Sequence, residues 1–151
     1  MDAGRLTPGR LDAPLIVAGG LGTGLLGLGA ALLLRASVDT GSAGPTAATM
    51  AEAFSLLYGA AAGLALGTAV VTVMARAGPR IVTGLLAGLL GYVAVLAPVL
   101  VATRPSDVSV PDAVGTAAFA AILVTPAILL GAAVGAAVAA SLRNRPGWKH
   151  D

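Results

Sequence analysis

Cysteine is absent from this sequence of 151 residues, and aromatic and charged residues are scarce, at 3% and 11%. Without cysteine the chain has no disulfide framework, no thiol nucleophile and no cysteine-ligated metal. Its single histidine, His150, lies in the tail, so no Ser, His and Asp catalytic set can be assembled. These absences argue against an enzyme and against a bound metal ion or cofactor.

Charged side chains are also missing from four long apolar stretches. The nine basic and seven acidic residues all lie outside residues 13–34, 53–75, 81–103 and 113–142. Hydrophobic residues reach 57% of the chain, whereas soluble domains contain roughly 45–50%. Each stretch exceeds the about 20 apolar residues that a helix needs to cross a membrane. We therefore predict an all-α integral membrane protein with four transmembrane helices in a bundle.

The first stretch, residues 13–34, resembles a secretory signal in one respect, because Arg5 and Arg10 precede it. The apolar part of a signal peptide is typically about 7 to 15 residues long, and this stretch is longer. We therefore expect it to be retained as a helix.

Basic residues are distributed unequally over the two membrane sides that alternate along the chain. One side holds both tails, residues 1–12 and 143–151, and the turn at 76–80, and the other holds only Arg35 and Arg104, together with four acids. Cytoplasmic segments carry the excess of Lys and Arg. We therefore expect a multi-pass protein of the cell membrane with its N-terminus and C-terminus in the cytoplasm. The basic residues of the first side are Arg5, Arg10, Arg76, Arg80, Arg143, Arg145 and Lys149.

The net charge of the whole chain is only +2. No basic stripe alternates with aromatic residues, so nucleic acid is not expected as a partner. The predominance of arginine over lysine favours a GC-rich bacterial genome.

The two halves of the chain resemble each other weakly. Residues 23–27 (TGLLG) resemble residues 87–91 (AGLLG), and residues 59–63 (GAAAG) match residues 131–135 (GAAVG). A genuine duplication predicts two tandem two-helix units of the same orientation. The alternative is that tracts of Gly, Ala and Leu align by chance.

Glycines recur at four-residue spacing in all four stretches. This spacing places them on one helix face, where the missing side chain lets another backbone come close. One bundle could use all these faces internally, or could leave one face for another membrane protein or a second copy of the chain. The helix-packing candidates are Gly20, Gly24, Gly59, Gly63, Gly67, Gly84, Gly88, Gly131 and Gly135.

Two prolines, Pro98 and Pro126, lie in the middle of the third and fourth stretches. Each removes a backbone hydrogen bond and tends to kink its helix. Such kinks act as hinges, line a cavity or only shape the packing. We expect Thr125 or another helix to satisfy a carbonyl group that a proline leaves free.

Hydroxyl groups are expected to have local structural roles. Thr49 stands three residues before Glu52, and Ser109 stands three before Asp112, which predicts a capping box at the start of the second and fourth helices. Most hydroxyls inside the stretches are expected to bond their own helix backbone. The hydroxyl groups inside the stretches are those of Thr23, Ser55, Tyr58, Thr68, Thr72, Thr83, Tyr92, Thr116 and Thr125.

The apolar stretches contain no ionisable residue for proton-coupled or sodium-coupled transport. The small-residue faces favour an accessory or self-associating membrane component that acts through helix packing in the lipid bilayer. A small transporter or channel component for a neutral or apolar solute is the second hypothesis, because the repeat and the prolines suit a path between helices. A holin-like pore comes third, and an intramembrane enzyme last.

Single cysteines introduced into this cysteine-free chain test the orientation. A cysteine at Ser42 or Ser109 should react with an impermeant maleimide in intact cells, because the charge distribution places both positions outside. A cysteine at Ala77 should react only after the cells are permeabilised. Labelling of a cysteine at Ala77 in intact cells would show that the orientation is the opposite of the one expected.

Overall fold

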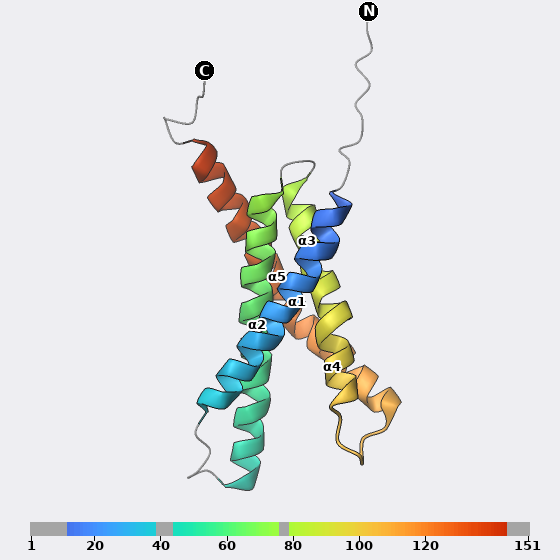
Figure 1. Ribbon diagram of the computed structural model, residues 1–151. Coiled ribbons are helices and arrows are strands. Elements are labelled where there is room, and N and C mark those ends of the chain that lie inside the picture. Colours follow the sequence, from blue (N-terminus) through green and yellow to red (C-terminus); the bar gives the residue numbers. More distant parts are fainter. Residues whose placement is uncertain (1–11, 39–43, 76–78, 145–151) are drawn as a thin grey trace, which may run out of the picture.

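The computed structural model describes residues 12–38, 44–75 and 79–144. These residues form four spans that are long and apolar enough to cross a membrane, and the spans pack against one another (Figure 1). The predicted all-α fold with four transmembrane helices is confirmed. The elements are α1 (Ala13–Ser37), α2 (Pro45–Met74), a third span of α3 (Arg80–Gly91), the π-helix η1 (Tyr92–Leu96) and α4 (Ala97–Ala102), and α5 (Val110–Arg143).

The two ends of the bundle are named here after one arginine at each end. α1 begins, α2 ends, α3 begins and α5 ends at the end that contains Arg80 (Figure 1). The opposite end contains Arg35, in the last turn of α1. We call these the Arg80 end and the Arg35 end.

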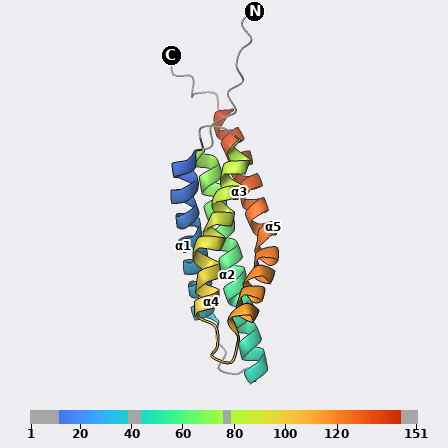
Figure 2. The same cartoon turned by 90° about the vertical axis from the view of Figure 1, so that its right-hand side faces the viewer.

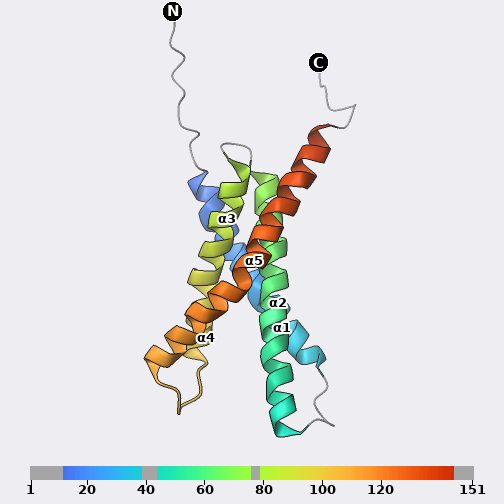
Figure 3. The same cartoon turned by 180° about the vertical axis from the view of Figure 1, so that it is seen from behind.

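α2 is the central helix of the bundle. It contacts α1, α3 and α5, and α1 and α5 lie on opposite sides of it (Figure 2). Towards the Arg35 end, the pair of α1 and α2 diverges from the pair of α4 and α5 (Figures 1 and 3). In the half that contains the Arg80 end, α1, α2 and α3 stay together and α5 packs along α2 (Figures 1 and 3).

Helix α2 begins at Pro45, well before the predicted start at residue 53. Gly44 has extended backbone angles and Pro45 occupies the first turn, where its missing N–H costs nothing. The apolar stretch starts only after Glu52, at residue 53. A carboxylate at the membrane surface does not interrupt helical hydrogen bonds, so the helix extends beyond it.

Of the two predicted capping boxes, the one at Thr49 and Glu52 is wrong and the one at Ser109 is confirmed as an N-cap. The Thr49 hydroxyl donates to the Pro45 carbonyl at 2.9 Å, because Thr49 already lies inside α2. The Ser109 hydroxyl oxygen accepts from the Asp112 amide at 3.3 Å. The Asp112 carboxylate accepts a bond from the same hydroxyl group.

Outside one buried cluster of larger side chains, small residues fill the interior of the bundle, and most large apolar residues lie on its surface. The buried residues of α1 are Gly, Thr and Ala only, whereas Leu33 is 75% exposed and Ile122 68% exposed. A water-soluble helix would bury its large apolar face. This distribution suits a hydrocarbon surrounding, in which large apolar side chains lose nothing by exposure and association depends on close packing.

Glycines of α2 bring its backbone directly against α1. A Cβ atom added at Gly63 would lie 2.5 Å from the Leu26 carbonyl oxygen, and one added at Gly59 would lie 2.5 Å from the Ala31 Cα. At Gly67 it would meet Thr23. No larger residue fits at these positions unless the two helices move apart.

Glycines of the second half have different neighbours from the glycines that they match in the first half. Gly59 and Gly63 pack against α1, whereas Gly131 and Gly135 pack against Ala65 and Ala69 of α2. The segment of the first half therefore packs α2 against α1, whereas the matching segment of the second half packs α5 against α2. The two halves do not repeat the same helix packing.

Replacing Gly63 with Ala should lower the free energy of unfolding by about 1–3 kcal/mol, as overpacking does in tightly filled cores. The cause is the 2.5 Å approach of the added Cβ atom to the Leu26 carbonyl oxygen. Unfolding in detergent measures the effect. Gly22→Ala is the matched control, since a Cβ atom at Gly22 meets nothing within 4 Å. Equal destabilisation by the two substitutions would contradict this packing.

Candidate functional site

A cavity of about 370 Å³ lies between the two helix pairs that diverge towards the Arg35 end. All four spans contribute to its wall, and most of the lining side chains are apolar. The lining residues are Leu28, Ala31, Leu32 and Arg35 of α1, Ala53, Leu56, Leu57 and Ala60 of α2, Tyr92, Leu96, Val99 and Leu100 of the third span, Thr103 directly after it, and Thr116, Ala120 and Val124 of α5.

The distribution of glycine explains why the cavity lies in this half of the bundle. The buried glycines of the third span and α5 all lie towards the Arg80 end, at Gly84, Gly88, Gly91, Gly131 and Gly135. The third span has no glycine between Tyr92 and Ala102. A Cβ atom at Gly115 of α5 would meet nothing within 4 Å. The two helix pairs therefore approach closely in one half only.

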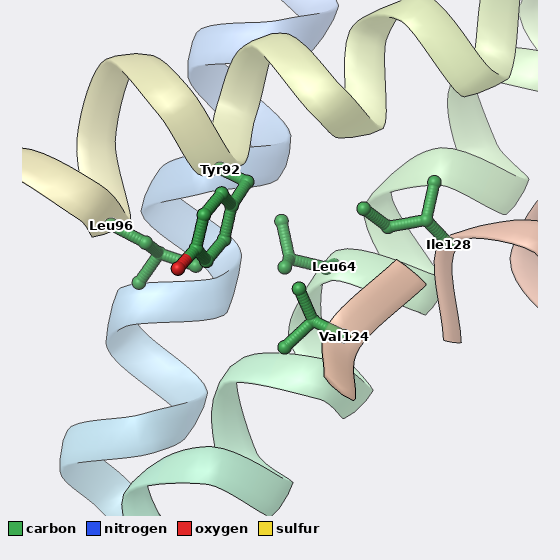
Figure 4. Close-up of a cluster of buried hydrophobic side chains, with 5 residues drawn as sticks. All are labelled: Leu64, Tyr92, Leu96, Val124 and Ile128. Carbon is green, nitrogen blue, oxygen red and sulfur yellow. The ribbon is translucent and has the colours of Figure 1, made fainter. Parts of the chain in front are cut away.

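A cluster of buried side chains closes the cavity in the middle of the bundle. Tyr92, Leu96 and Val124 belong both to this cluster and to the cavity wall. Leu64 and Ile128 complete the cluster and do not line the cavity. Figure 4 shows the Tyr92 ring between the side chains of Leu96 and Leu64, with Val124 of α5 facing them. Tyr92, Leu96 and Val124 therefore form the floor of the cavity, and Leu64 and Ile128 lie beneath it.

The Tyr92 hydroxyl group donates to the Ala117 carbonyl oxygen of α5 at 2.5 Å. It thus joins the third span to α5 at the level of the floor. This hydroxyl is an exception among groups that are expected mostly to bond their own helix, because the rigid ring holds the tyrosine hydroxyl away from its own backbone. Tyr58 differs again, since it is 64% exposed and stacks on Phe54 with ring centroids 6.2 Å apart.

Pro98 lies directly after the π-helix η1, in the first turn of α4. The Ala97 N–H bonds the Tyr92 carbonyl, five residues earlier, which widens the turn on the N-terminal side of the proline. Such bulges accommodate interruptions of the regular hydrogen-bond ladder. This widened segment carries two residues of the cavity floor, Tyr92 and Leu96.

Pro126 lies inside α5 and leaves the Ile122 carbonyl without its helical N–H partner. The Thr125 hydroxyl donates to the Ala121 carbonyl at 2.7 Å. The expectation that Thr125 satisfies the carbonyl freed by the proline is therefore wrong by one residue. A threonine hydroxyl bonds the carbonyl four residues before it, and that residue is Ala121.

Arg35 is the one charged residue of the cavity wall. Its Nη2 atom lies 3.1 Å from Oε2 of Glu52, which links the end of α1 to α2. The two side chains are 51% and 43% exposed, and ion pairs of such exposure contribute only about 0–1 kcal/mol. The guanidinium group therefore lies at the Arg35 end of an otherwise apolar cavity and is only weakly held by its partner.

Most of the other hydroxyl groups bond their own helix as predicted. Thr72 donates to the Thr68 carbonyl at 2.8 Å and Thr116 to the Asp112 carbonyl at 2.9 Å, and Ser55 and Thr83 behave alike. Thr23 and Thr68 are the exceptions, because their buried hydroxyl oxygens have no hydrogen-bond partner among the described residues. Each lies against a glycine of the neighbouring helix, Gly67 or Gly88. Their role is to fill the space that glycine leaves.

All nine glycines singled out from the sequence are buried between helices. None of them lines the cavity. The cavity residues form no polar motif, so no sequence pattern distinguishes them from residues that face lipid. One available signal was Tyr92, a tyrosine six residues before a proline in the middle of an apolar stretch.

Comparison with known proteins assigns no family to the chain. No protein-family model, no curated protein and no solved structure matches it. Among the described residues, no group of three or more His, Asp or Glu side chains is placed to hold a metal ion. Only the arrangement of the chain's own residues bears on its function.

Replacing Tyr92 with Phe should lower the free energy of unfolding by roughly 0.6 kcal/mol, the average for hydrogen bonds between membrane helices, and by no more than about 1.7 kcal/mol. The substitution removes only the bond to the Ala117 carbonyl. Tyr58→Phe is the matched control, because its ring is exposed. If both variants unfold like the wild type, the bond between η1 and α5 does not stabilise the bundle.

Proposed function

We propose that this protein is a small transporter or channel component that holds an apolar solute in the cavity between its two helix pairs. The observation that carries the proposal is the cavity of about 370 Å³ with an almost wholly apolar wall. Ligand cavities commonly enclose roughly 300–1,000 Å³. An apolar molecule of that size would be transferred into the cavity without losing hydrogen bonds.

The charge distribution supports an uncharged occupant for the deep part of the cavity. Arg35, at one end, is the sole ionisable group of the wall apart from the Tyr92 phenol. The Tyr92 hydroxyl hydrogen is already bonded to Ala117. A charged solute at the level of the floor would therefore find no counter-ion, and burying it there would cost several kcal/mol.

The alternative of an accessory or self-associating component was based on the glycine faces. These faces contact other helices of the same chain, as Gly63 contacts α1 and Gly131 contacts α2. The surface offers a protein partner mainly large apolar side chains, which equally suit lipid. The glycines therefore give no support to association, and the cavity supports solute binding.

We further propose that the Arg35 end faces away from the cytoplasm, in the cell membrane. The support is the excess of basic residues in the tails and in the turn at the Arg80 end. In this orientation the cavity lies in the outer half of the membrane. The closely packed Arg80 end then separates the cavity from the cytoplasm.

Filling the cavity tests the proposal. A long-chain hydrocarbon that carries a photoreactive diazirine should label Val124, which is only 2% exposed, and an excess of unlabelled hydrocarbon should suppress this labelling. Ala120→Phe should abolish the part of the Val124 labelling that unlabelled hydrocarbon suppresses, because the phenyl ring would occupy the cavity. Ala53→Phe, which fills the cavity from α2, should act alike.

Ala118→Phe is the matched control, since Ala118 lies two residues away on α5, is exposed and does not line the cavity. It should leave the labelling of Val124 unchanged. Thermal unfolding verifies that each variant folds. Labelling of Val124 that unlabelled hydrocarbon does not suppress, or that survives both cavity-filling substitutions, would refute solute binding. Purification with a stoichiometric protein partner, and no solute flux in proteoliposomes, would favour the accessory role.

A further inference from the structure

The position of Arg35 gives the cavity a polar end and an apolar end. Arg35 lies in the last turn of α1, at the surface of the bundle. From there the cavity wall continues back along α1 to Leu28, about 10 Å at ~1.5 Å per residue, and from Thr103 along the third span to Tyr92, about 16 Å by the same measure. A phospholipid in a membrane leaflet has the same order, with its head group at the surface and its acyl chain directed inwards.

Among the cavity residues, Arg35 is the group with hydrogen-bond donors to spare. A guanidinium group has five N–H donors, and the Glu52 carboxylate accepts from its Nη2 at 3.1 Å. The Thr103 and Thr116 hydroxyls donate to the Val99 and Asp112 carbonyls of their own helices. A ligand oxygen at this end of the cavity therefore finds its donors on Arg35.

We propose that the cavity binds a membrane phospholipid, with one acyl chain between the helix pairs and the phosphate group on Arg35. This inference rests on the proposed function and names the class of its ligand. The planar guanidinium group matches a phosphate in two parallel hydrogen bonds. The acyl chain extends over apolar side chains to the floor at Tyr92, where the wall offers no free donor.

Charge complementarity favours the phosphate group over a cationic head group. The cavity wall contains one cation and no carboxylate. Glu52, which pairs with Arg35, is half-exposed, so the pair is open to exchange with a second anion. The Asp112 carboxylate, also at this end, is engaged by the Ser109 hydroxyl.

Native mass spectrometry of the full chain in a nonionic detergent tests the assignment. The probes are phosphatidylglycerol, diacylglycerol with the same acyl chains but no phosphate, and glycerol phosphate with no chain. Phosphatidylglycerol should bind roughly tenfold more tightly than diacylglycerol, the factor expected for a charge-assisted hydrogen bond. Glycerol phosphate should not displace it. If glycerol phosphate displaces phosphatidylglycerol, the site binds only an anion at the surface, and the phospholipid assignment is wrong.

Arg35→Gln should remove the preference for phosphatidylglycerol over diacylglycerol, while the binding of diacylglycerol remains. Glu52→Gln breaks the same ion pair but leaves the cation, so it should keep or increase the preference. Arg104→Gln is the matched control, because Arg104 lies at the same end, bonds the Val101 carbonyl and does not line the cavity. If Arg35→Gln and Glu52→Gln lose the preference for phosphatidylglycerol equally, the ion pair only stabilises the fold.

The outcomes separate this inference from the proposed function. If Ala120→Phe blocks the photolabelling of Val124 and Arg35→Gln leaves the lipid preference intact, the cavity binds a solute but Arg35 does not bind a phosphate group. If phosphatidylglycerol binds equally well to Ala120→Phe and to Ala118→Phe, the acyl chain lies outside the cavity. The phospholipid assignment is then wrong.

Discussion

Close approach of helix backbones at glycine is the constraint on which the structure depends. In hydrocarbon, helices gain little from burying apolar side chains, because lipid tails are equally apolar. Association must come from van der Waals contact at short range, and Gly59 and Gly63 allow it by bringing the α2 backbone against α1. Threonines fill the remaining space, as Thr23 does against Gly67. Most of the large side chains, which a soluble protein would bury, are left to contact lipid.

The same constraint determines where the bundle is open. Gly84, Gly88 and Gly91 hold the third span close to its neighbours, and the segment after Gly91 contains no glycine. Larger residues such as Leu96 and Leu100 then separate the helix pairs and line a cavity. The distribution of one residue type along the chain thus produces a closed half and an open half. The open half is the part in which we propose that a solute binds.

The sequence was sufficient for the four spans and for the Ser109 cap, because hydropathy and capping depend on residues close together in the chain. It was not sufficient for the start of α2, since Pro45 begins the helix outside the apolar stretch that was counted. Nor did it show the bond from Tyr92 to the Ala117 carbonyl or the cavity. Both depend on the angle between helix pairs, and apolar wall residues such as Leu57 and Val99 differ in no local property from those that face lipid.

The central claim is that an apolar chain occupies the space between the helix pairs, and nuclear Overhauser contacts between lipid and protein methyl groups test it directly. In lipid nanodiscs with methyl-labelled Leu and Val, protons of the acyl chains should contact Val124 and Leu96, which are 2% and 5% exposed but line the cavity. They should not contact Leu64, which is fully buried beneath the floor. Contacts confined to exposed methyl groups such as those of Leu33 would contradict the account.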